Sequence, residues 1–357
     1  MGYSGSASRQ HTPARQRPEH EYYYDHYDHH AQPTHPVRPA AIKLEGPYGD
    51  FRDDLVKQGY TVIKSAISPD QAKAYQQKAF DWLASFNTPL DLADPSTWKA
   101  ENLPVQTKLN TFESYSVVHE KFMWDLRQED GIIEPFSEIW GTDKLVVSFD
   151  SVNITLPNRA DKPARSPWPH VDQSPLRQGL HCIQGIINLS QAGPEDGSLA
   201  LYPASHALVE EYFRTQTDES SWKPEDRYYF GKEGIKWFEE RGCKPIKVQA
   251  DPGDLILWDS RSIHWGAEQT PKSDTIRTVV YAAYAPAALA SADTLKQKKH
   301  VFEKFGATTH WPHDNMELRG LHAKLPDGQL DPRNRDRPRE MPEYTDKLLR
   351  LAGVKAY

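Results

Sequence analysis

Residues 166–172 read SPWPHVD and place a histidine, His170, two residues before an aspartate, Asp172. On an extended strand, side chains two residues apart point to the same face. A distant histidine, His264, follows the run PGDLILWD at 252–259, which predicts a tight turn, an apolar strand and then a polar turn that bears the histidine. Two imidazoles and one carboxylate form the ligand set that suits non-haem Fe(II) and leaves coordination positions open for chemistry. The pattern therefore predicts a metal site in a β-rich part of the chain.

Short runs of β-forming residues dominate the chain from residue 144 onward. Proline and glycine separate these runs, as in Gly193-Pro194 and Asp251-Pro252-Gly253. Many short strands of this kind are typical of a sandwich or jelly roll rather than of a parallel α/β sheet. The expected fold class is mainly β with flanking helices. The predicted strands span residues 144–156, 180–189, 198–202, 245–249, 254–258 and 275–285.

Helical patterns precede and interrupt the strands. Residues 51–58 form an amphipathic pattern that Gly59 ends, and residues 60–63 read as a strand. Ser68, followed by Pro69, predicts the N-cap of a helix that runs to about residue 86. Further helices are expected in other stretches, and residues 87–112 read as a loop. These helical stretches are 117–127, 132–140, parts of an aromatic and charged insertion at 212–243, and 293–305, which a proline-rich coil follows.

The domain organisation follows from these patterns. We expect one β-rich domain over residues 45–290, with N-terminal helices and the insertion at 212–243, and a helical and coil extension over 291–357. Residues 1–44 are rich in histidine, proline and tyrosine and are predicted to be a disordered tail, because they hold too few aliphatic residues to form a core. The tail contains His26-Tyr27-Asp28, which repeats the spacing of the metal pattern without an ordered context.

The composition excludes several classes of function. The chain has 357 residues, of which 38% are hydrophobic, and a formal net charge of −7, which disfavours nucleic-acid binding. It contains no apolar run long enough for a membrane helix and no apolar signal segment. Its only cysteines, Cys182 and Cys243, are too few for a disulfide framework. These features predict a cytoplasmic protein with a small-molecule partner.

Arg277 lies thirteen residues beyond His264 and begins a predicted strand. Its side chain shares a face with those of Val279 and Tyr281. An arginine buried beside an iron site requires an anion, and a dicarboxylate cosubstrate would form a bidentate pair with it.

The other histidines of the β-rich half fit the metal pattern less well. His181 and His206 have no carboxylate two residues away, and His313 directly precedes Asp314, which would point to the opposite face of a strand. We expect structural roles for His119, His181 and His206. The roles of His310 and His313 stay open, and one candidate role is that they belong to a lid over the site.

Four segments in the same order resemble the phytanoyl-CoA dioxygenase family. They are residues 59–63 (GYTVI) with the capped helix that follows, 170–172 (HVD), 196–206 (DGSLALYPASH) and 252–266 (PGDLILWDSRSIHWG). The resemblance covers about residues 50–290. It is strongest to fungal members of the family, many of which act on secondary metabolites. It implies a double-stranded β-helix (jelly roll) that uses Fe(II), O2 and 2-oxoglutarate.

The resemblance also implies roles for individual residues. His170, Asp172 and His264 would bind iron, Arg277 would bind the distal carboxylate of 2-oxoglutarate, and Thr155 or Asn153 would reach the same cosubstrate. Family members oxidise a small molecule and release succinate and CO2. Asp172 favours oxygenation over halogenation, because a small residue there would open a halide site. The chain departs from the common family pattern at Val171, Ala204 and Gly266.

The substrate cannot be read from the sequence. Four residues near the predicted metal site are candidates for contacting it: Trp168, Arg177, Gln184 and Arg261. Either arginine could pair with a substrate carboxylate, and a surface salt bridge is the equal alternative. Hydroxylation, desaturation and ring formation all stay open. The alternatives to an oxygenase are a non-catalytic jelly-roll binding or regulatory protein and a cupin-like metalloenzyme that does not use 2-oxoglutarate.

Overall fold

The computed structural model describes residues 38–39 and 42–357, so the predicted tail lies almost entirely outside the described residues. At the edge of that range, strand β1 (Arg38–Pro39) pairs in parallel with β7 (Arg177–Gln178). Ile42 forms an isolated antiparallel bridge with Leu180. Chain pairing therefore begins before residue 44, where the sequence suggested that the tail ends.

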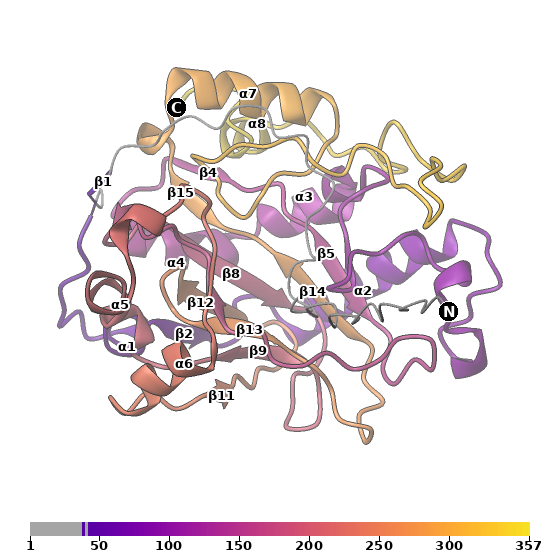
Figure 1. Cartoon of the computed structure of the whole chain (residues 1–357). Coiled ribbons are helices and arrows are strands. Elements are labelled where there is room, and N and C mark those ends of the chain that lie inside the picture. Colours follow the sequence, from indigo (N-terminus) through magenta and orange to yellow (C-terminus); the bar gives the residue numbers. More distant parts are fainter. Residues whose placement is uncertain (1–37, 40–41) are drawn as a thin grey trace, which may run out of the picture. The chain divides into compact units, whose positions relative to one another are not determined.

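Two antiparallel sheets form the centre of the fold (Figure 1). The larger sheet has the strand order β2-β12-β8-β14-β5-β3, and the smaller has the order β10-β6-β13-β9-β11. Strands β15 and β4 make a separate antiparallel pair. The mainly β jelly-roll prediction is confirmed, and the two sheets do not close into a barrel. The bounds are β2 (Tyr60–Ile63), β3 (Thr111–Phe112), β4 (Leu145–Val147), β5 (Val152–Thr155), β6 (His170–Val171), β8 (Ile183–Asn188), β9 (Ser198–Leu201), β10 (Tyr228–Tyr229), β11 (Ile246–Lys247), β12 (Leu255–Asp259), β13 (His264–Ala267), β14 (Arg277–Tyr281) and β15 (Tyr284–Pro286).

The side chains of the larger sheet alternate between two cores. Ile186, Ile256 and Val279 pack with Leu199 and Leu201 of the smaller sheet, so these residues fill the space between the sheets. Their chain neighbours point to the other face of the larger sheet and join the aromatic core formed with the helices: Ile183, Ile187, Leu255, Leu257 and Val280 pack with Leu55, Trp82, Trp124 and Phe136.

The helices on that second face begin at capped positions. Helix α1 (Phe51–Gln58) ends at Gly59, which adopts a left-handed conformation with φ of 77°. Helix α2 (Pro69–Ala84) begins at a capping box between Ser68 and Gln71. Both helices occur where the sequence predicts them, and α2 ends two residues earlier than expected. Helix α4 (Asp130–Trp140) was also expected.

The predicted helix over 117–127 is interrupted. It consists of a 3-10 turn (Val117–His119) followed by α3 (Lys121–Arg127), because Glu120 between them has an extended ψ of 148°. The Glu120 carboxylate accepts hydrogen bonds from the backbone N–H groups of Arg339 and Glu340. A contact with the C-terminal extension thus accompanies the break.

The insertion packs against the strand that bears His170. Its aromatic residues form a cluster with Val171 and Ile263: Tyr212, Phe213, Phe230, Trp237 and Phe238. Helices α5 (Val209–Gln216) and α6 (Lys232–Glu239) belong to this region. Helices α7 (Ala292–Glu303) and α8 (Asp346–Leu351) belong to the C-terminal extension. Helix α8 was not predicted. Further 3-10 turns are Pro95–Thr97, Ala100–Asn102, Ser205–Ala207, Glu219–Ser221 and Ala287–Leu289.

No helix among the described residues combines the length and the apolar character that crossing a membrane requires.

Gly59 offers a test of how tightly α1 is joined to the sheets. A Cβ at Gly59 would lie 2.5 Å from His206 Nδ1 and 2.5 Å from Ser262 Oγ, whereas a Cβ at Gly49, which has a similar φ of 80°, would meet no atom within 4 Å. We expect Gly49→Ala to lower the free energy of unfolding by about 1 kcal/mol through backbone strain alone. Gly59→Ala should lower it by roughly 2–4 kcal/mol, because the clash is added. Denaturant unfolding of both variants measures the difference, and equal losses would show that the contact is not tight.

Candidate active site

The three predicted metal ligands come together at the pairing of two short strands. His170 begins β6 and His264 begins β13, and these residues lie directly opposite each other in the antiparallel register. His264 therefore starts a strand and does not sit in the polar turn that the sequence suggested. Asp172 follows β6, and its backbone N–H donates to the carbonyl of Ser260 at 3.0 Å. The smaller sheet thus supplies both imidazoles and the carboxylate.

The distances between the three side chains suit a single cation. His170 Nε2 lies 3.4 Å from Asp172 Oδ1, and His264 Nε2 lies 3.2 Å from Asp172 Oδ2. One ligand atom from each residue can be chosen so that all lie within 4.8 Å of one another, and all three residues are buried. Within residues 38–39 and 42–357 no other group of three such residues is found. The tail spacing at His26 lies outside the described residues.

Backbone carbonyls orient both imidazoles in the same way. Nδ1 of His170 lies 3.2 Å from the carbonyl oxygen of Trp168, and Nδ1 of His264 lies 2.9 Å from that of Ser262. A carbonyl only accepts hydrogen bonds, so each Nδ1 must carry the proton and donate it. Each Nε2 then keeps its lone pair for a cation, which is the usual outer arrangement of a metal-binding histidine.

The charge states also suit metal binding. Burial alone would raise the pKa of Asp172, but the His170 and His310 imidazoles nearby outweigh it, and the pKa lies well below its ordinary value. Burial lowers the pKa of His170, against the opposing effect of Asp172. At neutral pH the site therefore holds a carboxylate and a neutral imidazole, the forms that bind a metal.

Two further side chains contact the Asp172 carboxylate. The Gln184 side-chain amide donates to Oδ2 at 3.1 Å, and Arg227 Nε lies 3.9 Å from Oδ1. Gln184, which the sequence suggested as a substrate contact, therefore hydrogen-bonds a predicted metal ligand. Arg227 belongs to the insertion, where no sequence pattern marked it.

Aromatic rings flank both histidines. The Trp168 ring stacks on the His170 ring with a centroid distance of 4.3 Å and an interplanar angle of 12°. The Tyr229 ring also lies beside His170, at a centroid distance of 5.8 Å. Trp258 meets His264 edge to face at 5.4 Å. Trp168 thus packs directly on a predicted metal ligand, and its role as a substrate contact stays a prediction.

Arg277 lies on the larger sheet, opposite Thr155 of the neighbouring strand. It is two residues before Val279, which packs between the sheets, so the alternation of a strand directs Arg277 toward the same interior. Asn153 lies opposite Val279. The Asn153 amide donates to the Leu109 carbonyl at 2.7 Å, and its oxygen accepts from Thr155 Oγ1 at 2.8 Å. Asn153 is thus engaged within the chain.

Arg177 and Arg261 both have carboxylate partners in the chain. Arg177 binds Asp226 and Asp314. Arg261 binds Asp259 at 2.7 Å and Glu210 at 3.4 Å. These ion pairs argue against the substrate-carboxylate role that the sequence suggested for the two arginines.

The remaining histidines divide into two kinds. His119, His181 and His206 each contact a backbone carbonyl through Nε2, which confirms their expected structural roles. His310 Nε2 and His313 Nδ1 are buried and have no hydrogen-bond partner within the part of the chain that the structure describes, and the same holds for Nδ1 of His206.

Comparisons with known proteins identify the family of the chain. The profile of the phytanoyl-CoA dioxygenase (PhyH) family matches residues 55–279. "Ava biosynthesis cluster protein O" of Aspergillus versicolor is 38% identical over 271 residues, which cover 74% of this chain and 87% of that protein.

Solved structures share the architecture at low sequence identity. The GlcNAc Inducible Gene 2 protein of Candida albicans is 13% identical, with a TM-score of 0.53, and the match covers 86% of this chain and 76% of that one. EctD from S. alaskensis is 16% identical, with a TM-score of 0.46, and the match covers 73% of this chain and 85% of that one.

The family match spans more than half of the chain and includes the metal motif, the distal histidine and the arginine. Together with the identity to the Aspergillus protein, it establishes the family without help from the distant structures. The chain belongs to the phytanoyl-CoA dioxygenase family, and it is a non-haem iron oxygenase that depends on 2-oxoglutarate and O2.

Proposed function

We propose that this protein oxidises a small organic molecule in secondary metabolism, with Fe(II) bound by His170, Asp172 and His264. Hydroxylation is the reaction proposed first, and desaturation and ring formation use the same centre. The relative from Aspergillus versicolor is named for a biosynthesis cluster, which supports the metabolic setting. The net charge of −7 fits a small-molecule substrate better than a nucleic acid.

One observation carries this proposal: two Nε2 atoms and one buried carboxylate converge while both Nδ1 atoms are tied to carbonyls. This donor set fits Fe(II), because imidazole and carboxylate ligands on one face are those of non-haem iron oxygenases. Neither cysteine belongs to the group, and thiolates would favour softer metals.

Bound iron would supply the oxidising chemistry, with 2-oxoglutarate converted to succinate and CO2 as O2 is consumed. The protein's own residues keep the ligands in place. Gln184 holds the Asp172 carboxylate, and the carbonyls of Trp168 and Ser262 fix the imidazole tautomers. The stacked Trp168 ring and the edge of Trp258 limit rotation of the two imidazoles and exclude water beside them.

Arg277 is the proposed partner of the distal carboxylate of 2-oxoglutarate. It faces the interior between the sheets, on the strand next to Thr155. The guanidinium can form two parallel hydrogen bonds with a carboxylate. Thr155 is the proposed second contact, and Asn153 supports it by accepting its hydroxyl hydrogen bond at 2.8 Å.

Membership of the family argues against the two alternatives that the sequence left open, a non-catalytic jelly roll and a cupin-like metalloenzyme. A jelly roll that only binds a ligand would not need the full ligand set together with Arg277. A cupin-like enzyme that does not use 2-oxoglutarate would not need an arginine on the interior face of the larger sheet.

The first prediction concerns the iron centre. Adding Fe(II) and 2-oxoglutarate without oxygen should give a weak charge-transfer band in the visible, because the keto acid chelates iron held by the three ligands. His264→Ala should abolish the band. His322→Ala, at an exposed histidine, should leave it unchanged. Absorption spectra of the folded proteins measure this, and a full band in His264→Ala would refute the proposed ligand set.

The second prediction concerns Arg277. Arg277→Met should weaken 2-oxoglutarate binding on the order of 10- to 100-fold, since a charge-assisted pair contributes about 1.5–3 kcal/mol. Iron binding should persist, and Arg277→Lys should recover part of the affinity, because it keeps the charge without the bidentate geometry. Titrating the visible band with 2-oxoglutarate gives the affinities. Unchanged affinity in Arg277→Met would assign the carboxylate to another residue.

A further inference from the structure

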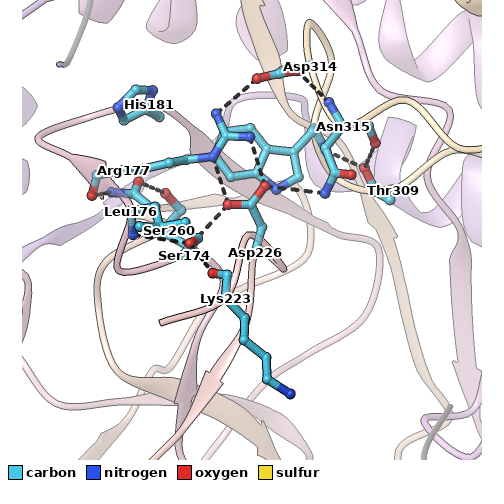
Figure 2. A network of polar contacts seen from close by, with 12 residues as sticks. Ser174, Leu176, Arg177, His181, Lys223, Asp226, Ser260, Thr309, Asp314 and Asn315 are labelled. Carbon is cyan, nitrogen blue, oxygen red and sulfur yellow. Dashed lines mark hydrogen bonds and ion pairs between the residues drawn. The ribbon is translucent and has the colours of Figure 1, made fainter. Parts of the chain in front are cut away.

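Three arginines were candidates for binding an anion near the iron site, and they are held in place by different means. Figure 2 shows the Arg177 guanidinium enclosed by the carboxylates of Asp226 and Asp314, to which it donates hydrogen bonds at 2.7 to 2.9 Å. Arg261 is likewise held by carboxylates. Arg277 forms no ion pair with any residue in the part of the chain that the structure describes. The position of the Arg277 guanidinium therefore depends on how its hydrocarbon stem packs.

Gly197 is the residue against which that stem packs. Arg277 begins β14 of the larger sheet, whereas Gly197 directly precedes β9 of the smaller sheet. A Cβ at Gly197 would lie 3.2 Å from Arg277 Cδ and 3.3 Å from the Ala267 carbonyl oxygen. Carbon atoms in favourable contact are about 3.5–4.0 Å apart, so a side chain at this position would push the stem away. The Arg277 stem thus reaches across to the backbone of the smaller sheet.

The backbone conformation does not explain why this position is a glycine. Gly59 and Gly253 have positive φ angles, which favour glycine, but Gly197 does not. Another residue could therefore adopt the backbone conformation of Gly197 without strain. What only glycine provides here is the space that the Arg277 side chain occupies.

The turn that carries Gly197 is fixed by Asp196. The Asp196 carboxylate accepts hydrogen bonds from Ser273 Oγ at 2.6 Å and from the Gly193 N–H at 2.9 Å, and both Asp196 and Ser273 are buried. Ser273 lies shortly before Arg277, in the segment that leads into β14. One carboxylate thus joins the turn that presents Gly197 to the segment that presents Arg277.

We propose that Gly197 is a positioning residue for Arg277. The space left by its missing side chain lets the Arg277 stem lie against the smaller sheet, and this contact sets the guanidinium where it meets the distal carboxylate of 2-oxoglutarate. Asp196 supports the contact by holding the turn against Ser273. The inference rests on the proposed function, because it assumes that Arg277 binds the cosubstrate. It gives Asp196 and Gly197, at the start of the segment 196–206, a role in cosubstrate binding.

Titration of the visible band with 2-oxoglutarate, on the full chain with Fe(II) and without oxygen, measures this role. We expect Gly197→Ala to weaken 2-oxoglutarate binding roughly two- to fivefold, because the stem must move only slightly. Gly197→Val should weaken it roughly 10- to 100-fold, because a branched side chain displaces the stem further. The Fe(II) affinity should stay as in the wild type, since Arg277, Ala267 and Gln269 supply the atoms nearest to the Cβ position.

Gly231→Ala and Gly231→Val are the matched controls for these variants. Gly231 also lacks a positive φ, and a Cβ there would meet no atom of the described residues within 4 Å. Both controls should therefore bind 2-oxoglutarate as the wild type does.

A double-mutant cycle with Arg277→Met separates the positioning of Arg277 from a general structural effect. The methionine side chain is nearly as long as the arginine stem, so the clash with Gly197→Val persists, but there is no guanidinium to displace. Gly197→Val should therefore weaken 2-oxoglutarate binding in the wild-type background. In the Arg277→Met background it should have no further effect, within about twofold.

Asp196→Ala removes the link to Ser273 without adding bulk, and it tests the same route should Gly197→Val fail to fold. We expect roughly three- to tenfold weaker 2-oxoglutarate binding, with Fe(II) binding retained. Asp254→Ala is the matched control, because the buried Asp254 carboxylate likewise accepts the N–H of the residue three positions before it, at 2.8 Å, but in another turn. This control should leave the 2-oxoglutarate affinity unchanged.

The outcomes separate this inference from the proposed function. Failure of the wild type to form the visible band would refute the proposed function. A normal band, with weaker binding in Arg277→Met but with Gly197→Val binding as tightly as Gly231→Val, would overturn the positioning role of Gly197. An equal loss from Gly197→Val in both backgrounds would overturn it as well, because the residue would then act elsewhere. Unchanged affinity in Asp196→Ala would overturn the supporting role of Asp196.

Discussion

The pairing of β6 with β13 is the constraint on which the active site depends. Each of these strands is short, and only one register sets His170 opposite His264. A slip of one residue would turn a histidine to the opposite face of the sheet, because side chains alternate along a strand. The aromatic cluster of the insertion packs against Val171, and the β12 strand ends a few residues before His264, so large packed elements support a small pairing. The geometry of the proposed iron site therefore depends on the packing of these larger elements.

Much of the fold could be predicted, because its signals are local. Gly59 and the Ser68 capping box mark the ends of α1 and the start of α2, and the apolar run at 255–259 forms a strand with side chains in both cores. The short strands β6 and β13 could not be predicted, since runs of two and four residues carry no periodicity. The break at Glu120 depends on residues more than 200 positions away, and no local pattern encodes it.

The site divides in the same way. His170, Asp172, His264 and Arg277 could be predicted as site residues because each lies in or beside a motif of the family resemblance. For Arg177 and Arg261 the sequence leaves a substrate carboxylate and a salt bridge as equal alternatives, since a sequence shows a charge without showing its partner, and in the structure buried aspartates pair with both. Arg227 comes from the insertion, whose position depends on tertiary contacts alone.

The most direct test of the account is anomalous diffraction at the iron absorption edge, from crystals of the Fe(II) and 2-oxoglutarate complex grown without oxygen. The account predicts one strong iron peak contacted by Nε2 of His170, Nε2 of His264 and the Asp172 carboxylate, with 2-oxoglutarate reaching Arg277. An iron peak elsewhere, such as on the histidines of residues 1–37, with no density between the three buried ligands, would contradict it.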